Sequence, residues 1–258
     1  MVSKSKTNYV LSLQKKKVRN DEGLFVIEGD KIVKDFLSAK VRLKILFAVP
    51  EFISDLTPAT KGYIDEIEPV SYEELRKLSS LKTPHNALAV IPVFKKKFDS
   101  SDLNNGLSVA LDFVQDPGNL GTIIRSAAWF GIKNIYCSED CVDVYNPKVI
   151  QASMGAILHV NIFYTGLEKL LKGANENKIK VYGAVVDGES VYSKKLDNNG
   201  IILLGNESRG ISEDLFPFIT DRLMIPKFNE AKAVIDSLNV SMAASVIFSE
   251  FRRSYLPQ

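Results

Sequence analysis

The spacing of hydrophobic residues between positions 107 and 137 changes from that of a strand to that of a helix and back again. Residues 107–114 are almost continuously apolar, which predicts a strand in a sheet covered on both faces. Asp116, Pro117, Gly118 and Asn119 then provide turn chemistry, and Asn119 is expected to cap the next helix. Apolar residues recur at helical spacing as far as Gly131, and residues 133–137 are predicted to form a second strand.

This strand, loop, helix and strand unit predicts where a ligand binds. An open parallel sheet holds its ligands in the crevice outside the carboxyl ends of its strands. Asn119 and Arg125 lie in the loop and the early turns of the helix, so both are expected in that crevice. A solvated surface arginine is the alternative interpretation of Arg125.

Two later stretches repeat this pattern. Residues 201–210, IILLGNESRG, form a short apolar strand followed by a polar loop bounded by glycines. Residues 223–241 pass from a third strand through a loop to the sequence DSLNVS at the start of a helix. Three such loops in one half of the chain predict one composite site.

The rest of the chain indicates two α/β domains. Strands and helices alternate from residue 107 onward, with a final helix at about 237–251, and this alternation predicts a parallel sheet with helices on both faces. Residues 1–94 alternate in the same way, with a helix at 8–19 and a capping box at Ser71. Residues 95–106 lack apolar periodicity, so they are the predicted linker between a domain at 1–94 and a domain at 107–258.

Composition narrows the class of protein. The chain has 258 residues, of which 45% are hydrophobic, and no stretch approaches the length of a membrane span. Because the first residues also lack the apolar core of a secretory signal, a cytoplasmic location is expected. Cys137 and Cys141 have no second pair to complete a zinc site, and we expect both to be free thiols.

Charge is unevenly distributed although the net charge is only +2. The first 44 residues hold eleven Lys or Arg against five Asp or Glu, and the densest part is Lys15, Lys16 and Lys17 followed by Arg19. Such a run is either a solvated helix face or a site that neutralises nucleic-acid phosphates.

The sequence lacks the motifs of several other classes of enzyme. The chain has neither the glycine pattern of a dinucleotide fold nor that of a P-loop, and it has no G-x-S-x-G elbow. His85 and His159 lie outside the three loops and without a nearby ligand partner, so no metal site is expected.

The three loops together resemble a known family. DPGNLGTIIR, LGNESRG, and IP followed by SLNVS are similar, in sequence and order, to the signature motifs of the SpoU/TrmH-type RNA ribose methyltransferases of the SPOUT superfamily. The N-terminal third resembles the substrate-binding domain that many members carry. The resemblance implies a C-terminal domain with a trefoil knot, S-adenosylmethionine as cofactor, and methylation of a ribose 2′-hydroxyl in ribosomal RNA. Transfer RNA is the second candidate, and a non-catalytic RNA-binding or ribosome-assembly protein is the alternative.

The resemblance also assigns roles to individual residues. It places Leu204, Gly205, Asn206, Ile225 and Leu238 at the cofactor, and it implies catalytic or RNA-placing roles for Asn119, Arg125, Glu207, Ser237 and Asn239. Helix capping by Asn119 and Ser237, a polar position on a helix face for Asn239 and a loop charge for Glu207 are the structural alternatives.

Arg125 is the central residue of this hypothesis. Because a guanidinium keeps its proton, Arg125 is expected to orient the target phosphate and ribose and to stabilise the developing alkoxide, although the family also allows a role as base. The stretch 228–236 departs from the family pattern, being about four residues longer. The family further implies a homodimer through the catalytic domain, and the small residues Ser241, Ala244 and Ser245 with Phe248 offer one helix face for it, unless that face packs on its own sheet.

Overall fold

The computed structural model describes residues 2–94, 103, 106–228 and 237–255 of the chain. These residues form two compact units. One unit comprises Met1–Lys95 and Asp143–Leu158, and the other comprises Lys96–Val142 and His159–Gln258. The domain bounds expected from the sequence stay a prediction, but the sequence did not indicate that residues 143–158 would belong with the first unit.

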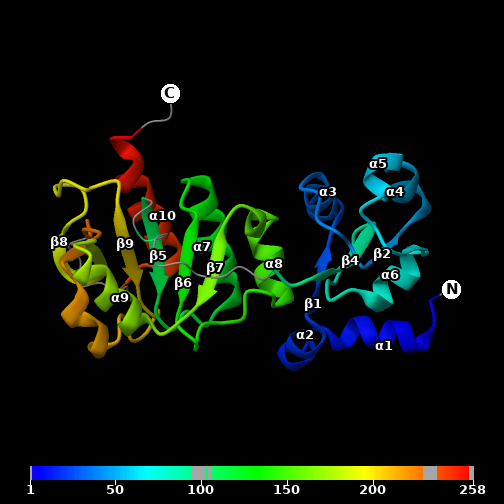
Figure 1. Ribbon diagram of the computed structural model, residues 1–258, viewed down its shortest axis with the longest axis horizontal. Coiled ribbons are helices and arrows are strands. Elements are labelled where there is room, and N and C mark those ends of the chain that lie inside the picture. The colour runs from blue at the N-terminus through cyan, green and yellow to red at the C-terminus, as the bar shows by residue number, and fades with distance from the viewer. Residues whose placement is uncertain (1, 95–102, 104–105, 229–236, 256–258) are drawn as a thin grey trace. The chain divides into compact units, whose positions relative to one another are not determined.

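The first unit is a four-stranded sheet with helices around it (Figure 1). The strand order is β1-β4-β2-β3, with β4 antiparallel to both of its neighbours and β2 parallel to β3. Its elements are α1 (Lys4–Ser12), α2 (Lys16–Glu22), β1 (Leu24–Glu28), α3 (Asp30–Ser38), β2 (Ile45–Ala48), α4 (Pro50–Ser54), α5 (Pro58–Lys61), β3 (Ile67–Pro69), α6 (Tyr72–Leu78), β4 (Ala87–Pro92), α8 (Pro147–Ser153) and η2 (Ala156–Leu158).

In the first unit, the structure confirms one prediction made from a local sequence pattern and contradicts another. The capping box is confirmed, because Ser71 accepts from the backbone N–H of Glu74 and the Glu74 carboxylate accepts from that of Ser71. The single helix expected at 8–19 is wrong: α1 and α2 are separated near Gln14. The buried Arg19 guanidinium donates to the carbonyls of Leu13 and Gln14, which directly follow the last residue of α1.

The segment 143–158 is held to the first unit by polar and aromatic contacts. Arg19 forms a buried ion pair with Asp143. The hydroxyl of Tyr145 accepts from the Phe94 N–H and donates to the Phe94 carbonyl, and its ring lies 4.5 Å from that of Phe25. A segment between two strands of one sheet therefore becomes part of the core of the other unit.

The second unit contains a six-stranded sheet in which every pairing is parallel, in the order β10-β8-β9-β5-β6-β7. This confirms the predicted parallel α/β domain. The elements are β5 (Leu107–Leu111), α7 (Pro117–Trp129), β6 (Asn134–Cys137), β7 (Asn161–Tyr164), α9 (Leu167–Glu176), β8 (Val181–Ser190), β9 (Gly200–Leu204), η3 (Glu213–Phe218), β10 (Asp221–Met224) and α10 (Val240–Arg253).

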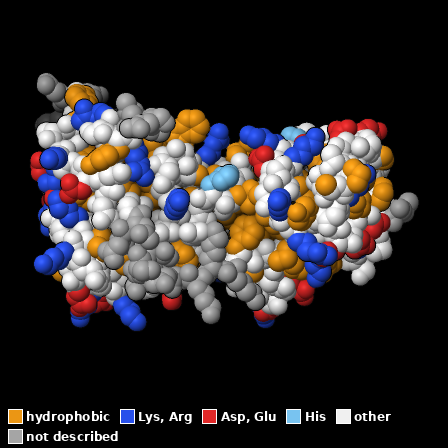
Figure 2. Space-filling model, turned by 45° about the horizontal axis from the view of Figure 1, so that its top comes forward, with side chains coloured by type: hydrophobic (Ala, Val, Ile, Leu, Met, Phe, Trp, Pro, Cys, Tyr) orange, Lys and Arg blue, Asp and Glu red, His pale blue; other side chains and the backbone are white. Residues whose placement is uncertain are grey.

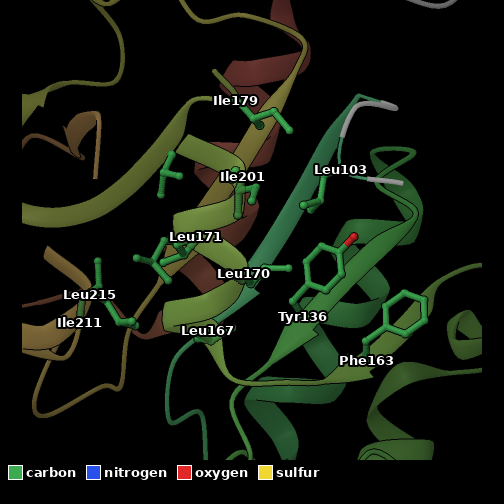
Figure 3. Packing of buried hydrophobic residues seen from close by; sticks show 14 residues of the cluster. Leu103, Tyr136, Phe163, Leu167, Leu170, Leu171, Ile179, Ile201, Ile211 and Leu215 are labelled. Carbon is green, nitrogen blue, oxygen red and sulfur yellow. The ribbon is translucent and has the colours of Figure 1, made fainter. Parts of the chain in front are cut away.

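Helices cover both faces of this sheet, which explains why β5 and β9 are buried at every position. On one face, Leu167, Leu170 and Leu171 of α9 pack on side chains of the central strands (Figure 3). Tyr136 stacks on Phe163 there, with ring centroids 5.7 Å apart. The opposite face carries α7 and α10 (Figures 1 and 3).

The last helix packs on α7 of its own chain. Ser126 and Ser245 share a hydrogen bond of 2.7 Å, and Arg252 donates to the carbonyl of Phe130. Ala244 and Phe248 are fully buried. The small-residue face of α10 is thus used within the protomer, so its assignment to a dimer interface was wrong.

Two further expectations concern the chain as a whole. Among the residues that the structure describes, no helix is both long and apolar enough to cross a membrane. The trefoil knot stays a prediction, and the departing stretch 228–236 lies outside the described residues except for Phe228.

Candidate active site at the carboxyl ends of β5 and β9

The site lies at the point in the sheet where the strands that follow β5 in the chain are placed on its two opposite sides. From β5 the chain adds β6 and β7 on one side, whereas β9, β8 and β10 lie on the other. β5 and β9 are parallel neighbours with Leu111 paired to Leu204, so the loops that follow them leave the same edge together. This topological switch point is where open α/β sheets bind ligands.

The loop after β5 is closed by hydrogen bonds at both ends. Asp112 is buried and accepts from the backbone N–H of Ser212 at 2.7 Å, which ties this loop to the chain after β9. Asp116 caps α7 by accepting from the N–H of Asn119 at 2.8 Å. The expectation that Asn119 is the cap was therefore wrong. Pro117 occupies the first helical position, where its missing N–H costs nothing, and this places the cap at Asp116.

The loop after β9 is a tight hairpin between Asn206 and Gly210, whose backbones exchange two hydrogen bonds of 2.9 Å. A Cβ on Gly205 would lie 2.2 Å from the carbonyl carbon of Gly210, so the absence of a side chain lets the hairpin close on itself. The family resemblance places Gly205 at the cofactor. The structure adds a second reason for a glycine at this position, because only a residue without a side chain lets the hairpin close.

Asn206 joins the two loops through its side chain. Its carbonyl oxygen accepts from the N–H groups of Ser208 and Arg209, at 2.9 and 3.1 Å. Its amide nitrogen donates to the Phe113 carbonyl at 2.9 Å and to the Glu207 carboxylate at 3.3 Å. The Asn206 amide is thus occupied in shaping the site, and its predicted contact with the cofactor stays a prediction. Leu204 is buried in the sheet core.

The third loop contributes Asn239, which caps α10 by accepting from the N–H groups of Ser241 and Met242. The helix therefore begins at Val240, and Ser237 is exposed and is not its cap. Leu238 is 52% exposed, and Ile225 after β10 is half-buried. The side chains of Ile225 and Leu238 are available to a ligand, as their predicted role requires.

A chain of hydrogen bonds brings residues of all three loops together. The Asn239 amide donates to the Asn119 carbonyl oxygen at 2.9 Å, and the Asn119 amide donates to a Glu207 carboxylate oxygen at 2.5 Å. The Asn206 amide donates to the other Glu207 oxygen. Three residues predicted from separate motifs, Asn119, Glu207 and Asn239, thus form one connected polar network.

Arg125 is not part of this network. Its side chain is exposed, and within the described residues it makes no hydrogen bond or ion pair. It lies on the outer face of α7, one turn before Trp129, whose side chain is 84% exposed. The guanidinium is therefore free to meet a group from outside the protomer.

Phe113 and Arg209 are part of the site but were missed by the sequence reasoning. Phe113 has a φ of 59°, a left-handed conformation that is unfavourable for a bulky side chain. The Arg209 guanidinium lies 5.1 Å from the centroid of the Phe113 ring. No sequence signal marks a phenylalanine as left-handed, so only the structure reveals this pair.

The basic segment of the first unit, Lys15–Arg19, exposes fewer positive charges than its sequence contains. Lys15, Lys16 and Lys17 are exposed, but Arg19 is 2% exposed and paired with Asp143. Figure 2 shows Lys and Arg side chains spread over the face in view, with Asp and Glu among them. Only the lysines of this segment are available to neutralise phosphates.

The two cysteines are free thiols, as expected, and both are buried. The hydrogen bond from Cys137 lowers the pKa of Cys141 to about 7, while the same bond and burial raise the pKa of Cys137. Cys141 also accepts from the N–H of Val114, which joins it to the loop after β5. In the part of the chain that the structure describes, no group of three or more His, Cys, Asp or Glu could hold a metal ion.

Fold and site together define an α/β protein with a composite site of three loops at the switch point of a parallel sheet. Comparison with known families places it more narrowly. The chain belongs to the SpoU rRNA Methylase family, whose model matches residues 106–249, and residues 4–89 match an MRM3-like substrate binding domain.

Individual proteins agree with this placement. The chain is 26% identical to the 23S rRNA (guanosine(2553)-2′-O)-methyltransferase RlmP of Bacillus subtilis, over 93% of each chain. A solved TrmH-family structure from Porphyromonas gingivalis is 35% identical, with a TM-score of 0.87 over 98% of this chain and 99% of that one. An AdoMet-bound rRNA methyltransferase from Sinorhizobium meliloti, 24% identical, shares the fold with a TM-score of 0.83 over 100% and 98% of the two chains.

Proposed function

We infer that the protein transfers a methyl group from S-adenosylmethionine to a ribose 2′-hydroxyl in ribosomal RNA. The observation that carries this inference is the hydrogen-bonded network of Asn119, Glu207 and Asn239 at the switch point, because it assembles the polar residues of all three family motifs. The Bacillus relative is named for this reaction on 23S rRNA, and the N-terminal match to a substrate binding domain supports a large RNA substrate.

The residues at the site fit the cofactor. S-adenosylmethionine supplies an electrophilic methyl group on a sulfonium, and its adenosyl part needs apolar surface. Leu238 is 52% and Phe228 82% exposed, and both lie between the end of β10 and the start of α10. The half-buried Ile225, which follows β10, adds a third apolar side chain. The Sinorhizobium protein of the same fold was solved with AdoMet bound.

The chain's own residues then have distinct tasks. Both carboxylate oxygens of Glu207 already accept hydrogen bonds, from Asn119 and Asn206, so Glu207 holds the loops in position. Arg125 carries a positive charge and has no hydrogen-bond or ion-pair partner among the described residues, so it binds a target phosphate and stabilises the alkoxide that develops as the hydroxyl proton passes to water. Such preorganised charge is a large part of most catalytic rate enhancements.

The function is tested by methylation of RNA from a strain that lacks the gene. The purified protein, tritiated S-adenosylmethionine and unmodified ribosomal RNA should give a 2′-O-methylated nucleoside on mass spectrometry, with EDTA present. Transfer to tRNA instead would select the second candidate substrate. Cofactor binding without transfer to either RNA would favour the non-catalytic alternative.

We propose further that the active form is a homodimer in which Arg125 reaches the site of the second copy. Trp129 supports this, because a large apolar side chain that is 84% exposed is unusual on a monomer and it lies on the same face of α7 as Arg125. Light scattering should give twice the 28.7 kDa of one chain, and Trp129→Glu should give a monomer with little activity. An active wild-type monomer would contradict the shared site.

A further inference from the structure

Phe113 is held in an unfavourable backbone conformation by its neighbours. Its φ of 59° belongs to a region that bulky residues rarely occupy. Its N–H donates to Ser138 Oγ at 3.0 Å, and its carbonyl accepts from the Asn206 amide at 2.9 Å. Residues whose strain is maintained in this way cluster at functional sites. The strain fixes the half-buried ring at the carboxyl end of β5.

Arg209 is fixed over that ring. Its N–H donates to the side-chain oxygen of Asn206, which shapes the loop, and its guanidinium lies 5.1 Å from the centroid of Phe113. The side chain is exposed and forms no ion pair with a described carboxylate. The guanidinium carbon therefore lies over the ring, and the exposed side chain remains accessible from solvent.

Such a stack is suited to an RNA base rather than to a phosphate. Proteins that recognise unpaired RNA stack its bases on aromatic rings and on the planes of arginine guanidinium groups. An arginine fork can also bind a phosphate, but here the guanidinium carbon lies over an aromatic ring at the end of β5, and together they offer a surface on which a base can stack. Arg209 is two residues from Glu207, so a base on this stack would lie beside the network that faces the ribose.

We propose that Phe113 and Arg209 form a stacking platform for a base of the substrate RNA at or next to the methylated nucleotide. The platform is a substrate-positioning element of the methyl transfer, and the proposal rests on the function proposed above. It assigns a role to the φ of Phe113, because another backbone conformation would move the ring away from Arg209.

Three variants at position 209 separate stacking from charge. Arg209→Ala removes both, Arg209→Lys keeps only the charge, and Arg209→Tyr keeps only a planar surface. Because stacking of one base contributes a factor of about ten to a hundred in affinity, the KM for ribosomal RNA should rise about that much in Arg209→Ala and Arg209→Lys. Arg209→Tyr should recover most of it. The affinity for S-adenosylmethionine should stay at the wild-type value in all three.

A second measurement does not depend on methyl transfer. A short single-stranded RNA containing 2-aminopurine loses fluorescence when that base stacks. Wild type and Arg209→Tyr should quench it, whereas Arg209→Ala and Arg209→Lys should not. Phe113→Gly removes the ring while its backbone still adopts a φ of 59° without strain, so the loop should keep its path, but the variant should quench weakly because Arg209 has lost its support.

Each contrary outcome has a definite meaning. If Arg209→Lys restores the KM and Arg209→Ala lowers the salt dependence of RNA binding by about one counterion, Arg209 contacts a phosphate and the platform is refuted. If Arg209→Ala changes only the melting temperature, the stack merely stabilises its loop. Quenching by the wild type without any methyl transfer would keep the platform and reject the proposed function.

Discussion

The substitution Gly205→Ala tests whether the hairpin after β9 must be closed for the site to work. The added Cβ would lie 2.2 Å from the carbonyl carbon of Gly210 and 2.3 Å from both its oxygen and the nitrogen of Ile211. All three are backbone atoms, so no rotation of a side chain relieves the overlap. The hairpin must open, and the two hydrogen bonds between Asn206 and Gly210 are lost.

The cost follows from these contacts. Forcing a methyl group into a packed site costs about 1–3 kcal/mol, and overlap with three backbone atoms places Gly205→Ala at the upper end of that range. The two hydrogen bonds favour the closed hairpin in the wild type and in the variant alike, so they do not add to this difference. Because the hairpin can open without unfolding β9, the cost of about 3 kcal/mol appears as a smaller population of the closed form. Cofactor affinity should therefore fall by up to about 100-fold, since each 1.4 kcal/mol is a factor of ten.

Calorimetric titration with S-adenosylmethionine measures the effect, with two alanine substitutions as controls. Gly166→Ala meets no atom within 4 Å and should bind as the wild type does. Gly210→Ala also meets no atom but has a φ of +72°, so it should cost about 1–2 kcal/mol. Wild-type affinity and melting temperature for Gly205→Ala would refute the requirement for a closed hairpin.

Three further predictions concern single groups. Arg125→Ala should lower single-turnover methylation by about 10²–10³ while cofactor affinity in calorimetry stays unchanged. Asp143→Ala should lower the free energy of unfolding in urea by about 3–5 kcal/mol because it leaves the buried Arg19 unpaired, whereas Arg19→Met with Asp143→Leu should cost much less. Because the pKa of Cys141 is lowered to about 7 when folded, its thiolate should make the free energy of unfolding rise between about pH 7 and pH 9, and Cys141→Ser should abolish that rise.

The fold could be predicted where one short stretch carries its own signal. The strands of the second unit are buried on both faces, so their apolar runs identify β5 and β9, and Gly131 with a φ of +67° ends α7 as expected. β3 and β7 were not predicted, because most of their positions are half-buried or exposed and neither forms a continuous buried run as β6 does. The placement of residues 143–158 depends on Asp143 meeting Arg19, 124 positions away, and no local pattern encodes that contact.

The site was predictable as a set of residues but not as an arrangement. The order of the motifs identified Asn119, Glu207 and Asn239, and the structure joins them. Ser237 followed the same motif yet lies exposed and apart from the network in the described chain. The stack of Phe113 on Arg209 depends on a backbone angle, which a residue name does not specify.

The cap of α7 explains how the network can exist. Had Asn119 capped the helix, its side-chain oxygen would point to the backbone N–H groups of the first turn instead of to the Asn239 amide. Pro117 moves the cap to Asp116, and Asn119 then lies within the first turn with both its amide groups free to bridge. Because its oxygen faces the Asn239 amide, its nitrogen faces Glu207, and this ties the loop after β9 to α7. A proline at the first helical position thus determines which side chain links the three loops.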